Sequence, residues 1–203
     1  MLKGTAKVGT DIRRGQISQA ALRIIARVGV RGLTTSSIAQ EVGISEANIY
    51  RHFRNKDEIL SVTVEEIGNG LRRNFENVLI INTADSPLKK LRRAFLLHLD
   101  YIEKNGGIPR LVFSDEVHIG NEELKQKLLQ SITVYASTLE GLIREGKKLG
   151  TIRSNIDPKS SAFMLIGMVQ ITTLRWSLGG FSFSLVTEGM KLWENYEKCI
   201  KTS

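Results

Sequence analysis

The segment from Gly43 to Phe53, GISEANIYRHF, carries side chains that can recognise nucleic acid. Arg and Asn can each form two hydrogen bonds with the edge of a guanine or an adenine, and Tyr can donate to a phosphate oxygen. A helix this short is not stable alone in water, so one narrow face must pack against the rest of the protein. Its polar face remains free, and contact with a groove of DNA is the chemistry that suits it.

The distribution of charge favours the same chemistry. The chain of 203 residues has a formal net charge of +8, from 29 Lys and Arg against 21 Asp and Glu. Residues 1–56 hold ten of the basic and three of the acidic side chains, and therefore account for +7 of this charge. A positive charge confined to the first quarter of a chain is typical of a DNA-binding module.

The residues before this segment predict the elements that must position it. Apolar residues at helical spacing predict a first helix over 11–28, and a threonine-capped second helix ends at about Val42. Ser45 is the predicted cap of a third helix over about 46–52, with an acidic residue in its first turn, where the helix dipole favours negative charge. Three short helices are therefore expected in the basic part of the chain.

Three residues predict that the second and third helices cross closely. Ala39 supplies a small side chain where two helices can meet, and Gly43 supplies a residue that tolerates a positive φ in the turn. Ile49 points inward and fixes the third helix. This spacing predicts a helix-turn-helix, in which the third helix enters the major groove of DNA.

The rest of the chain is predicted to be helical as well. Its three prolines each lie near the first position of a helix, where the missing N–H has no consequence. A fourth helix is expected from about Lys56 or Asp57 to the early eighties. The later helices are expected over 87–104, 109–118, 122–147, 158–178 and 185–200. The predicted fold class is all-α, with about nine helices.

Residues 32–60, GLTTSSIAQEVGISEANIYRHFRNKDEIL, resemble the DNA-binding signature of the tetracycline-repressor (TetR/AcrR) family of transcriptional regulators. The matching features are the Gly-Leu-Thr-Thr start, the Ile-Ala pair, the Tyr-x-His-Phe end of the third helix and the Asn-Lys-Asp-Glu-Ile-Leu opening of the fourth. The resemblance implies an all-helical homodimer with DNA-binding residues 1–56 and an effector-binding and dimerisation domain over residues 57–203.

The resemblance also implies which residues meet DNA. Matches to phosphate-contacting positions are Thr35, Tyr50, His52 and Lys56, and matches to positions near the bases are Glu46, Ala47, Asn48 and Arg51. Ser45 at the helix start and Ser36 complete the expected DNA-binding set, although Ser36 stands where some members carry a basic residue.

Two roles in this part of the chain stay open at the sequence level. Glu46 can accept a hydrogen bond from cytosine N4, or it can serve only to cap its helix. The basic residues of the N-terminus, among them Lys3, Lys7, Arg13 and Arg14, can form an arm that reaches DNA, or they can belong to a tail without a specific role.

The resemblance implies a small-molecule pocket, for which the later apolar and aromatic residues are the candidates. Each residue taken singly is more typical of a core, and only the resemblance favours the set. The candidate residues are Phe95, His98, Tyr101, Ile102, Phe113, Val117, Tyr135, Leu139, Phe163, Met168 and Trp176. The nearly continuous apolar run over 162–176 and the last helix are the expected dimer contact, because a helix that is apolar on several faces must be buried on several sides.

Other classes of protein are less consistent with the residues. Asp115 and His118 can share one helical face, but they supply only two metal ligands, so no metal and no cofactor are expected. There is no glycine-rich phosphate loop and no nucleophile motif, which argues against an enzyme. The single cysteine, Cys199, the lack of a signal-peptide pattern and the lack of a long apolar run favour a cytoplasmic location away from the membrane.

The sequence therefore predicts a ligand-responsive transcriptional regulator. Repression is favoured, with a palindromic double-stranded DNA operator bound by a homodimer through its last two helices and released by an unknown small-molecule effector. The alternative is a non-specific, architectural DNA-binding protein, which would share the basic first quarter but would not need a large, nearly neutral second domain.

Overall fold

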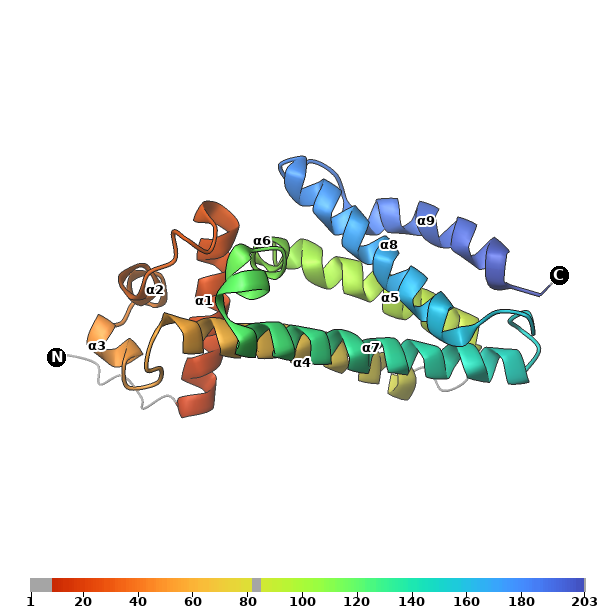
Figure 1. The fold of residues 1–203 in the computed structure, drawn as a ribbon, viewed down its shortest axis with the longest axis horizontal. Coiled ribbons are helices and arrows are strands. Elements are labelled where there is room, and N and C mark those ends of the chain that lie inside the picture. Colours follow the sequence, from red (N-terminus) through yellow and green to blue (C-terminus); the bar gives the residue numbers. More distant parts are fainter. Residues whose placement is uncertain (1–8, 82–84, 203) are drawn as a thin grey trace.

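The computed structural model describes residues 9–81 and 85–202, and these residues are largely helical (Figure 1). The helices are α1 (Thr10–Val28), α2 (Thr35–Val42), α3 (Glu46–Ile49), α4 (Lys56–Ile81), α5 (Pro87–Lys104), α6 (Gly107–Val112), the π-helical turn η1 (Glu116–Gly120), α7 (Glu122–Lys148), α8 (Pro158–Leu178) and α9 (Leu185–Ile200). An all-α fold is confirmed. The first part of the predicted basic arm, residues 1–8 with Lys3 and Lys7, lies outside the described residues.

Helices α1, α2 and α3 form a small unit at one end of the molecule, called the head below (Figure 1). Thr34 caps α2 in a reciprocal pair with Ser37, in which each side chain bonds to the other residue's backbone N–H. Gly43 ends α2 at φ 75° and ψ 37°, a left-handed conformation that glycine adopts without strain. Ala39 is 4% exposed at the helix crossing, so the helix-turn-helix predicted from Ala39, Gly43 and Ile49 is present.

Helix α3 is shorter than the predicted 46–52. It ends at Ile49, and the next residues form tight turns in which the amides of Arg51 and His52 bond to carbonyls three residues earlier, at 3.3 and 2.9 Å. The chain must turn here because Phe53, only 2% exposed, inserts into the core directly afterwards. The residues after Ile49 therefore leave the helix axis although they continue the same surface.

The prediction of a single helix over 109–118 is also wrong. Helix α6 begins two residues before Pro109 and ends at Val112, and η1 follows after a break. Ser114 lies in the break, where its hydroxyl donates to the Leu111 carbonyl at 2.8 Å and accepts from the Val117 amide at 3.4 Å. A serine hydroxyl offers backbone groups an alternative to helical hydrogen bonds, and this accounts for the interruption.

The larger part of the molecule is arranged around α5. This helix packs against α4, α7, α8 and α9, and its apolar side presents Leu91, Phe95 and Leu99, which are at most 2% exposed. Helices α4 and α7 run side by side along the long axis of the molecule, α8 packs against α7 and α5, and α9 packs against α5 and α8 (Figure 1). The long α4 starts at the head and continues into this body.

A second connection between head and body is made by α6. Gly107 lies so close to α1 that an added Cβ would be 2.1 Å from the carbonyl oxygen of Leu22. Three residues on, the Arg110 guanidinium donates to the carbonyl of Ala26 at 2.6 Å, near the end of α1. The same guanidinium lies 5.1 Å from the ring centre of Phe181, in the connection between α8 and α9. Helix α1 is thus held by both α4 and α6.

We expect Gly107→Ala to destabilise the protein, because the added methyl group would overlap a backbone atom that cannot move alone. Overpacking of this kind costs about 1–3 kcal/mol, which corresponds to a fall in Tm of roughly 2–10 °C for a protein of this size. Thermal unfolding measured by circular dichroism tests this. Gly141→Ala in α7 is the matched control, since an added Cβ there meets no atom within 4 Å. Equal Tm values for the two variants would contradict the close packing of α6 on α1.

Candidate DNA-binding surface and internal cavity

The exposed surface of α3 has the division of faces that the sequence predicts. Ile49 is fully buried, whereas Glu46, Ala47 and Arg51 are exposed and Tyr50 is 55% exposed. Ser45 caps the helix by accepting a hydrogen bond from the Asn48 amide at 3.3 Å. Because α3 packs on the rest of the head with its apolar side, its polar side chains stand on the outside of the head, where a groove of DNA can reach them.

The start of α2 and the polar face of α3 are connected by hydrogen bonds. The Thr35 hydroxyl donates to the Glu46 carboxylate and lies 3.3 Å from the Tyr50 hydroxyl. Glu46 therefore has a partner within the protein, which favours its structural role over recognition of cytosine. Ser36, next to Thr35, is exposed. These contacts hold Thr35, Glu46 and Tyr50 together as one patch.

Two of the predicted phosphate-contacting residues bond to other parts of the head, Lys56 through its side chain and His52 through its backbone. The Lys56 ammonium donates to the carbonyl of Val30 at 2.8 Å and is only partly exposed. An ammonium has three protons, so this bond leaves donors for a phosphate. His52 is half-buried, and its backbone carbonyl accepts a hydrogen bond from Arg14. Arg51 is exposed, and among the described residues it takes part in no ion pair.

Much of the positive charge of the head is used internally. Arg23 and Arg27 bind Glu41 at 2.8 and 2.7 Å and so tie α1 to α2. Their hydrogen bonds lower the pKa of the Glu41 carboxyl below its usual value. Because both arginines are more than half exposed, each pair adds little to stability. The net charge of the first quarter therefore overstates the number of cations that are free to face DNA.

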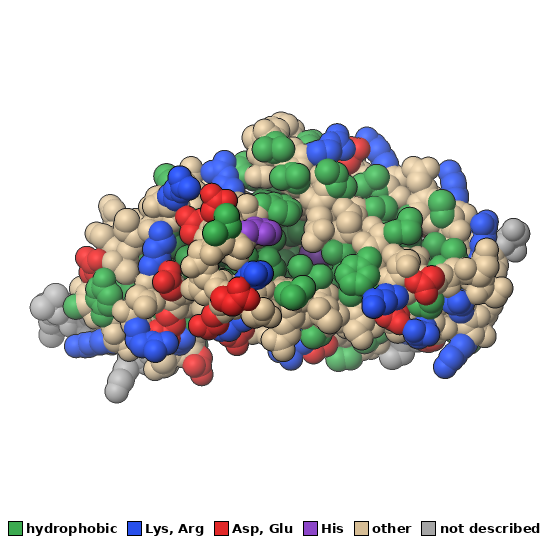
Figure 2. Space-filling model, in the orientation of Figure 1, with side chains coloured by type: hydrophobic (Ala, Val, Ile, Leu, Met, Phe, Trp, Pro, Cys, Tyr) green, Lys and Arg blue, Asp and Glu red, His purple; other side chains and the backbone are tan. Residues whose placement is uncertain are grey.

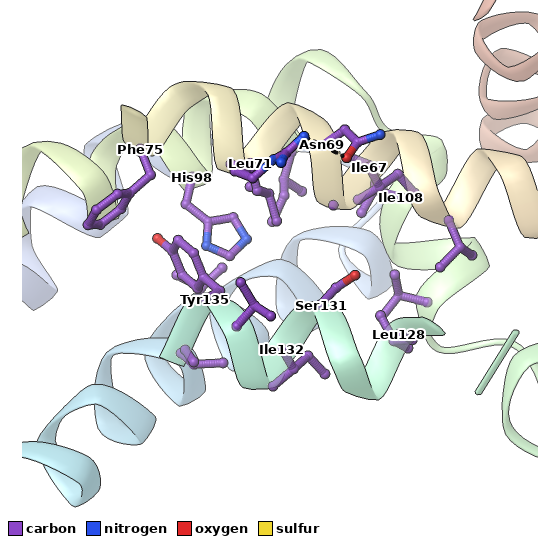
Figure 3. A pocket seen from close by; sticks show the side chains of 18 of the residues that line it. Ile67, Asn69, Leu71, Phe75, His98, Ile108, Leu128, Ser131, Ile132 and Tyr135 are labelled. Carbon is purple, nitrogen blue, oxygen red and sulfur yellow. Dashed lines mark hydrogen bonds between the residues drawn. The ribbon is translucent and has the colours of Figure 1, made fainter. Parts of the chain in front are cut away.

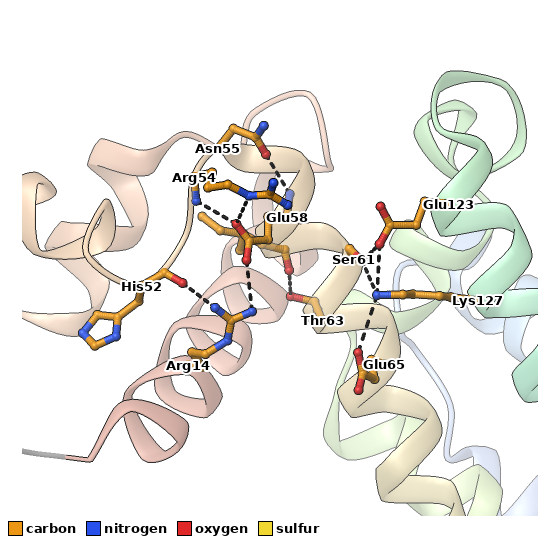
Figure 4. A network of polar contacts seen from close by, with 11 residues as sticks. Arg14, His52, Arg54, Asn55, Glu58, Ser61, Thr63, Glu65, Glu123 and Lys127 are labelled. Atoms are coloured by element: carbon orange, nitrogen blue, oxygen red, sulfur yellow. Dashed lines mark hydrogen bonds and ion pairs between the residues drawn. The ribbon is translucent and has the colours of Figure 1, made fainter.

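Arg14 joins the head to the start of α4 (Figure 4). Its guanidinium bonds to the His52 carbonyl and to Glu58 at 3.2 Å, and it lies 4.3 Å from the ring centre of Phe53. The Arg54 amide, followed by the Arg54 and Arg14 side chains, lowers the pKa of the Glu58 carboxyl despite partial desolvation. Arg14 is thus part of the internal structure of the head, and its side chain is not that of a free arm reaching for DNA.

The body encloses a cavity of about 730 Å³ beneath the middle of one face, where Figure 2 shows a hollow bordered by hydrophobic side chains. This volume lies in the range of roughly 300–1,000 Å³ that is usual for small-molecule sites. Most of the lining side chains are apolar. The lining comes from residues 64–79 of α4, His98 and Ile102 of α5, residues 108–113 in and after α6, residues 127–138 of α7 and residues 166–173 of α8.

Four of the eleven predicted pocket residues line this cavity: His98, Ile102, Phe113 and Tyr135. The other seven lie elsewhere. Phe95 packs against Trp193 at a centroid distance of 6.1 Å, and Trp176 packs against Phe181 at 4.6 Å. Phe163 is 45% exposed on α8. Val117 and Leu139 are buried core residues, and Tyr101 and Met168 are half-buried and pack on the core.

The sequence prediction missed the contribution of α4 and, apart from Tyr135, that of α7, although these two helices form the longest walls of the cavity. One signal was present in α4, where two glycines interrupt a long helix. An added Cβ at Gly68 would lie 2.7 Å from the Ser131 hydroxyl, and one at Gly70 would lie 2.4 Å from the Tyr101 hydroxyl. Glycine disfavours a helix, so two of them mark a place where other elements approach α4 closely.

A polar cluster fixes α4 to α7 at one part of the cavity wall (Figure 4). The Lys127 ammonium lies 2.6 Å from the Ser61 hydroxyl, 3.1 Å from Glu123 and 3.5 Å from Glu65. Ser61 in turn donates to Glu123 at 2.9 Å. Lys127 and Glu65 also line the cavity, so a molecule bound there would lie beside the same α4 segment that continues toward Glu58 and the head.

Two ionisable aromatic side chains meet inside the cavity (Figure 3). The ring centroids of His98 and Tyr135 are 5.0 Å apart, and the two rings are nearly perpendicular. Burial lowers the pKa of His98 to about 4, so its imidazole is neutral at physiological pH, and burial raises the pKa of the Tyr135 phenol. The cavity is therefore uncharged at this point but not wholly apolar.

Within residues 9–81 and 85–202, no three His, Cys, Asp or Glu side chains are placed to hold a metal ion. No helix among these residues is both long enough and apolar enough to cross a bilayer.

Two protein-family models match the chain. The model described as "Bacterial regulatory proteins, tetR family" matches residues 17–68, which contain most of the head and the start of α4. The model described as "YsiA-like protein, C-terminal region" matches residues 74–195, which contain the greater part of the body.

Similar proteins extend over most of the chain. A "Fatty acid metabolism regulator protein" of Bacillus subtilis (strain 168) is 28% identical over 172 residues, 84% of this chain and 87% of the relative. A "Nucleoid occlusion factor SlmA" of Vibrio vulnificus (strain YJ016) is 26% identical over 182 residues, 89% of this chain and 92% of the relative. The crystal structure of FadR from Bacillus subtilis in complex with stearoyl-CoA has a TM-score of 0.75 and 26% identity, and the match covers 90% of this chain and 96% of that chain.

We expect Arg51→Ala to relax the choice of base at one position of each half-site, because an exposed arginine in the turn directly after α3 can bind a guanine edge with two hydrogen bonds. The loss of discrimination at that position should be about 1–3 kcal/mol. Binding to a set of operators with single base changes measures it. The control is Arg92→Ala on α5, which removes the same charge far from the head. A uniform loss of affinity in the Arg51 variant, with an unchanged sequence profile, would show a phosphate contact instead.

Proposed function

Because the chain belongs to the tetR family of bacterial regulatory proteins, we propose that this DNA-binding transcriptional regulator responds to a long-chain acyl-CoA or a related acyl compound. Binding of the acyl compound in the cavity releases the protein from its operator. The observation that carries the proposal is the mainly apolar cavity of about 730 Å³, whose walls include the two elements, α4 and α6, that also hold α1.

The shape and lining of the cavity suit a long apolar molecule. The lining extends over residues 64–79 of α4 and 127–138 of α7, so the cavity follows two parallel helices for several turns. Burial of a flexible hydrocarbon chain is driven by removal of its apolar surface from water, about 25 cal/mol per Å². The relative from Bacillus subtilis is named a fatty acid metabolism regulator, and the solved FadR structure contains stearoyl-CoA. Both support an acyl effector for this chain.

DNA recognition is assigned to the polar face of α3 and the start of α2. We assign base reading to Arg51 and Asn48, and phosphate binding to Thr35, Tyr50, His52 and Lys56. Ser36, Ser45, Glu46 and Ala47 complete the surface. Residues 1–56, which include the head, are the DNA-binding unit, and residues 57–203 form the effector and dimerisation unit.

The effector can act on DNA binding only if it binds one arrangement of the head better than another. Two physical routes exist between the cavity and the head. Helix α4 passes from the cavity wall to Glu58, which is paired with Arg14 of α1. Helix α6 lines the cavity with Ile108 and touches α1 through Gly107 and Arg110. A ligand that displaces either helix changes the position of α1 and, through it, the orientation of α3.

The surface of α8 offers the dimer contact. Several large apolar side chains on this helix remain exposed in one chain, although neighbouring residues of the same helix are in the core. They are Phe163 at 45%, Met164 at 59%, Ile171 at 53% and Leu178 at 80% exposure. Met190 on α9 is also exposed, at 37%. An apolar surface of this kind is typical of a subunit interface, and two heads held by it would fit a palindromic operator.

The relative from Bacillus subtilis is named a regulator, and we expect this chain likewise to act by binding, in the cytoplasm, where bacterial DNA is located. A second possibility is that this chain functions as a nucleoid occlusion factor, because a relative with that name matches a similar share of the chain. The cavity between α4, α6 and α7 favours the effector-controlled regulator, and the experiment below separates the two.

In vitro selection on random duplex DNA at near-physiological salt should enrich a palindrome with half-sites about one helical turn apart, or a multiple of it. Stearoyl-CoA should then weaken binding to that palindrome by about 5–150-fold, the usual range of coupling between two sites. Free coenzyme A is the control, since it lacks the acyl chain and should have little effect. Fluorescence anisotropy of the labelled operator measures the affinity for DNA in the presence of each compound.

Specific DNA binding that no acyl-CoA weakens would overturn the proposed effector and leave the DNA-binding function. Salt-sensitive binding without enrichment of any sequence would instead place the protein among the non-specific DNA-binding proteins.

We expect Ile171→Glu to produce monomers with weak operator binding, because a charge would be buried at the centre of the proposed interface. Analytical ultracentrifugation gives the mass in solution. The control is Leu129→Glu, a residue of α7 with 54% exposure that should stay dimeric. A dimeric Ile171 variant would place the subunit contact on another surface.

A further inference from the structure

His98 is an unusual residue for the wall of an apolar cavity. It comes from α5, and its ring points into the cavity between the side chains of α4 and α7 (Figure 3). Its edge-to-face contact with Tyr135, at 5.0 Å, fixes the orientation of the ring, and Tyr135 makes a similar contact with Phe75 at 6.3 Å. A leucine or phenylalanine would fill the same space without introducing polar atoms.

Two polar atoms of residues that line the cavity lack hydrogen-bond partners within the described residues. Among the described residues, no donor or acceptor lies within hydrogen-bond distance of His98 Nδ1, which is shielded from solvent. The same holds for the Oγ1 atom of Thr173, which belongs to α8 and lines the same cavity. Thr173 is only 3% exposed. Two unpartnered polar groups from different helices therefore occur in the lining of one cavity.

Unpartnered polar groups are unfavourable inside a protein. A buried donor or acceptor without a partner lowers stability, whereas native proteins pair the great majority of such groups. The neighbouring Thr172 illustrates the ordinary solution, because its hydroxyl donates to the Met168 carbonyl at 2.7 Å within α8. A bound molecule that supplies the missing partner would remove the unfavourable term, and would do so only if it carries a polar atom at this depth.

We propose that His98 and Thr173 select the effector by hydrogen bonding to an oxygen atom on an otherwise apolar chain. This inference rests on the acyl effector proposed above. The oxygen is a carbonyl or a hydroxyl, because a neutral imidazole offers one donor and one acceptor and a threonine hydroxyl offers both. An effector without such an oxygen would leave both groups unpartnered and would bind more weakly.

Two sources can provide the oxygen. In the first, it is the thioester carbonyl at the head of the acyl chain. In the second, it is a hydroxyl carried along the chain. Three probes distinguish them: stearoyl-CoA, its thioether analogue S-octadecyl-CoA, which lacks only the carbonyl oxygen, and stearoyl-CoA with a hydroxyl near the middle of the chain.

The variants are His98→Phe, which keeps an aromatic ring against Tyr135 but removes both nitrogens, and Thr173→Val, which keeps the shape but removes the hydroxyl. Thr172→Val is the matched control for the second variant, since Thr172 is buried on the same helix but does not line the cavity. Isothermal titration calorimetry with the full-length protein measures the Kd of each probe.

If the thioester carbonyl is the recognised group, His98→Phe weakens stearoyl-CoA binding about tenfold, or about 1.4 kcal/mol, and leaves S-octadecyl-CoA unchanged. Thr173→Val weakens stearoyl-CoA binding about fivefold, as expected for one net hydrogen bond, and Thr172→Val has no effect. If the chain hydroxyl is recognised, the wild-type protein prefers the hydroxylated probe and His98→Phe abolishes that preference.

The inference is overturned if the wild-type protein binds stearoyl-CoA and neither variant changes the Kd of any probe by more than about twofold. If the wild-type protein binds none of the three probes, the acyl effector itself is wrong and this inference falls with it. The Tm of the unliganded His98→Phe variant supplies an independent readout. It should equal or exceed that of the wild type, because an unpartnered polar group has been replaced by an apolar one; a clear decrease would indicate a purely structural role.

Discussion

The position of α1 is the constraint on which the rest of the structure depends. This helix belongs to the head, but the elements that hold it in position belong to the body. Arg14 is paired with Glu58 at the start of α4, and the backbone at Leu22 is in direct contact with Gly107 of α6. Since α2 and α3 are fixed to α1 by their own packing and by the ion pairs of Glu41, the DNA-binding surface takes the position that α4 and α6 impose on it.

The helices could be predicted from the sequence because their ends carry local signals. Ser86-Pro87 and Asp157-Pro158 begin α5 and α8 at the predicted residues, and Gly43 ends α2 where a positive φ is needed. Such signals act within a few residues and do not depend on the rest of the fold. The prediction failed over 109–118, where the Ser114 hydroxyl competes for backbone groups and the outcome depends on how α6 packs on α1.

The cavity could be predicted only in part, for a different physical reason. Whether a buried aromatic residue faces a cavity or fills a core depends on how distant helices meet, and a residue's type does not reveal it. Tyr135 lines the cavity and Trp176 does not, although both are aromatic residues of long helices that pack in or against the hydrophobic core. Charge was a better guide to the head, but it could not show that Arg23 and Arg27 are committed to Glu41.

The glycines in the middle of α4 have a consequence for the mechanics of the molecule. Each glycine within a helix is about 1 kcal/mol less favourable than alanine, so α4 bends most easily at the turn containing Gly68 and Gly70, within the part of the helix that lines the cavity. A helix that bends easily at one turn does not transmit a displacement along its whole length, because the bend absorbs part of it. The half of α4 beyond Gly70 can therefore adapt to the size of a bound molecule, whereas a displacement of the cavity-lining residues 64–67, on the head side of this turn, is passed to the half of α4 that packs on α1.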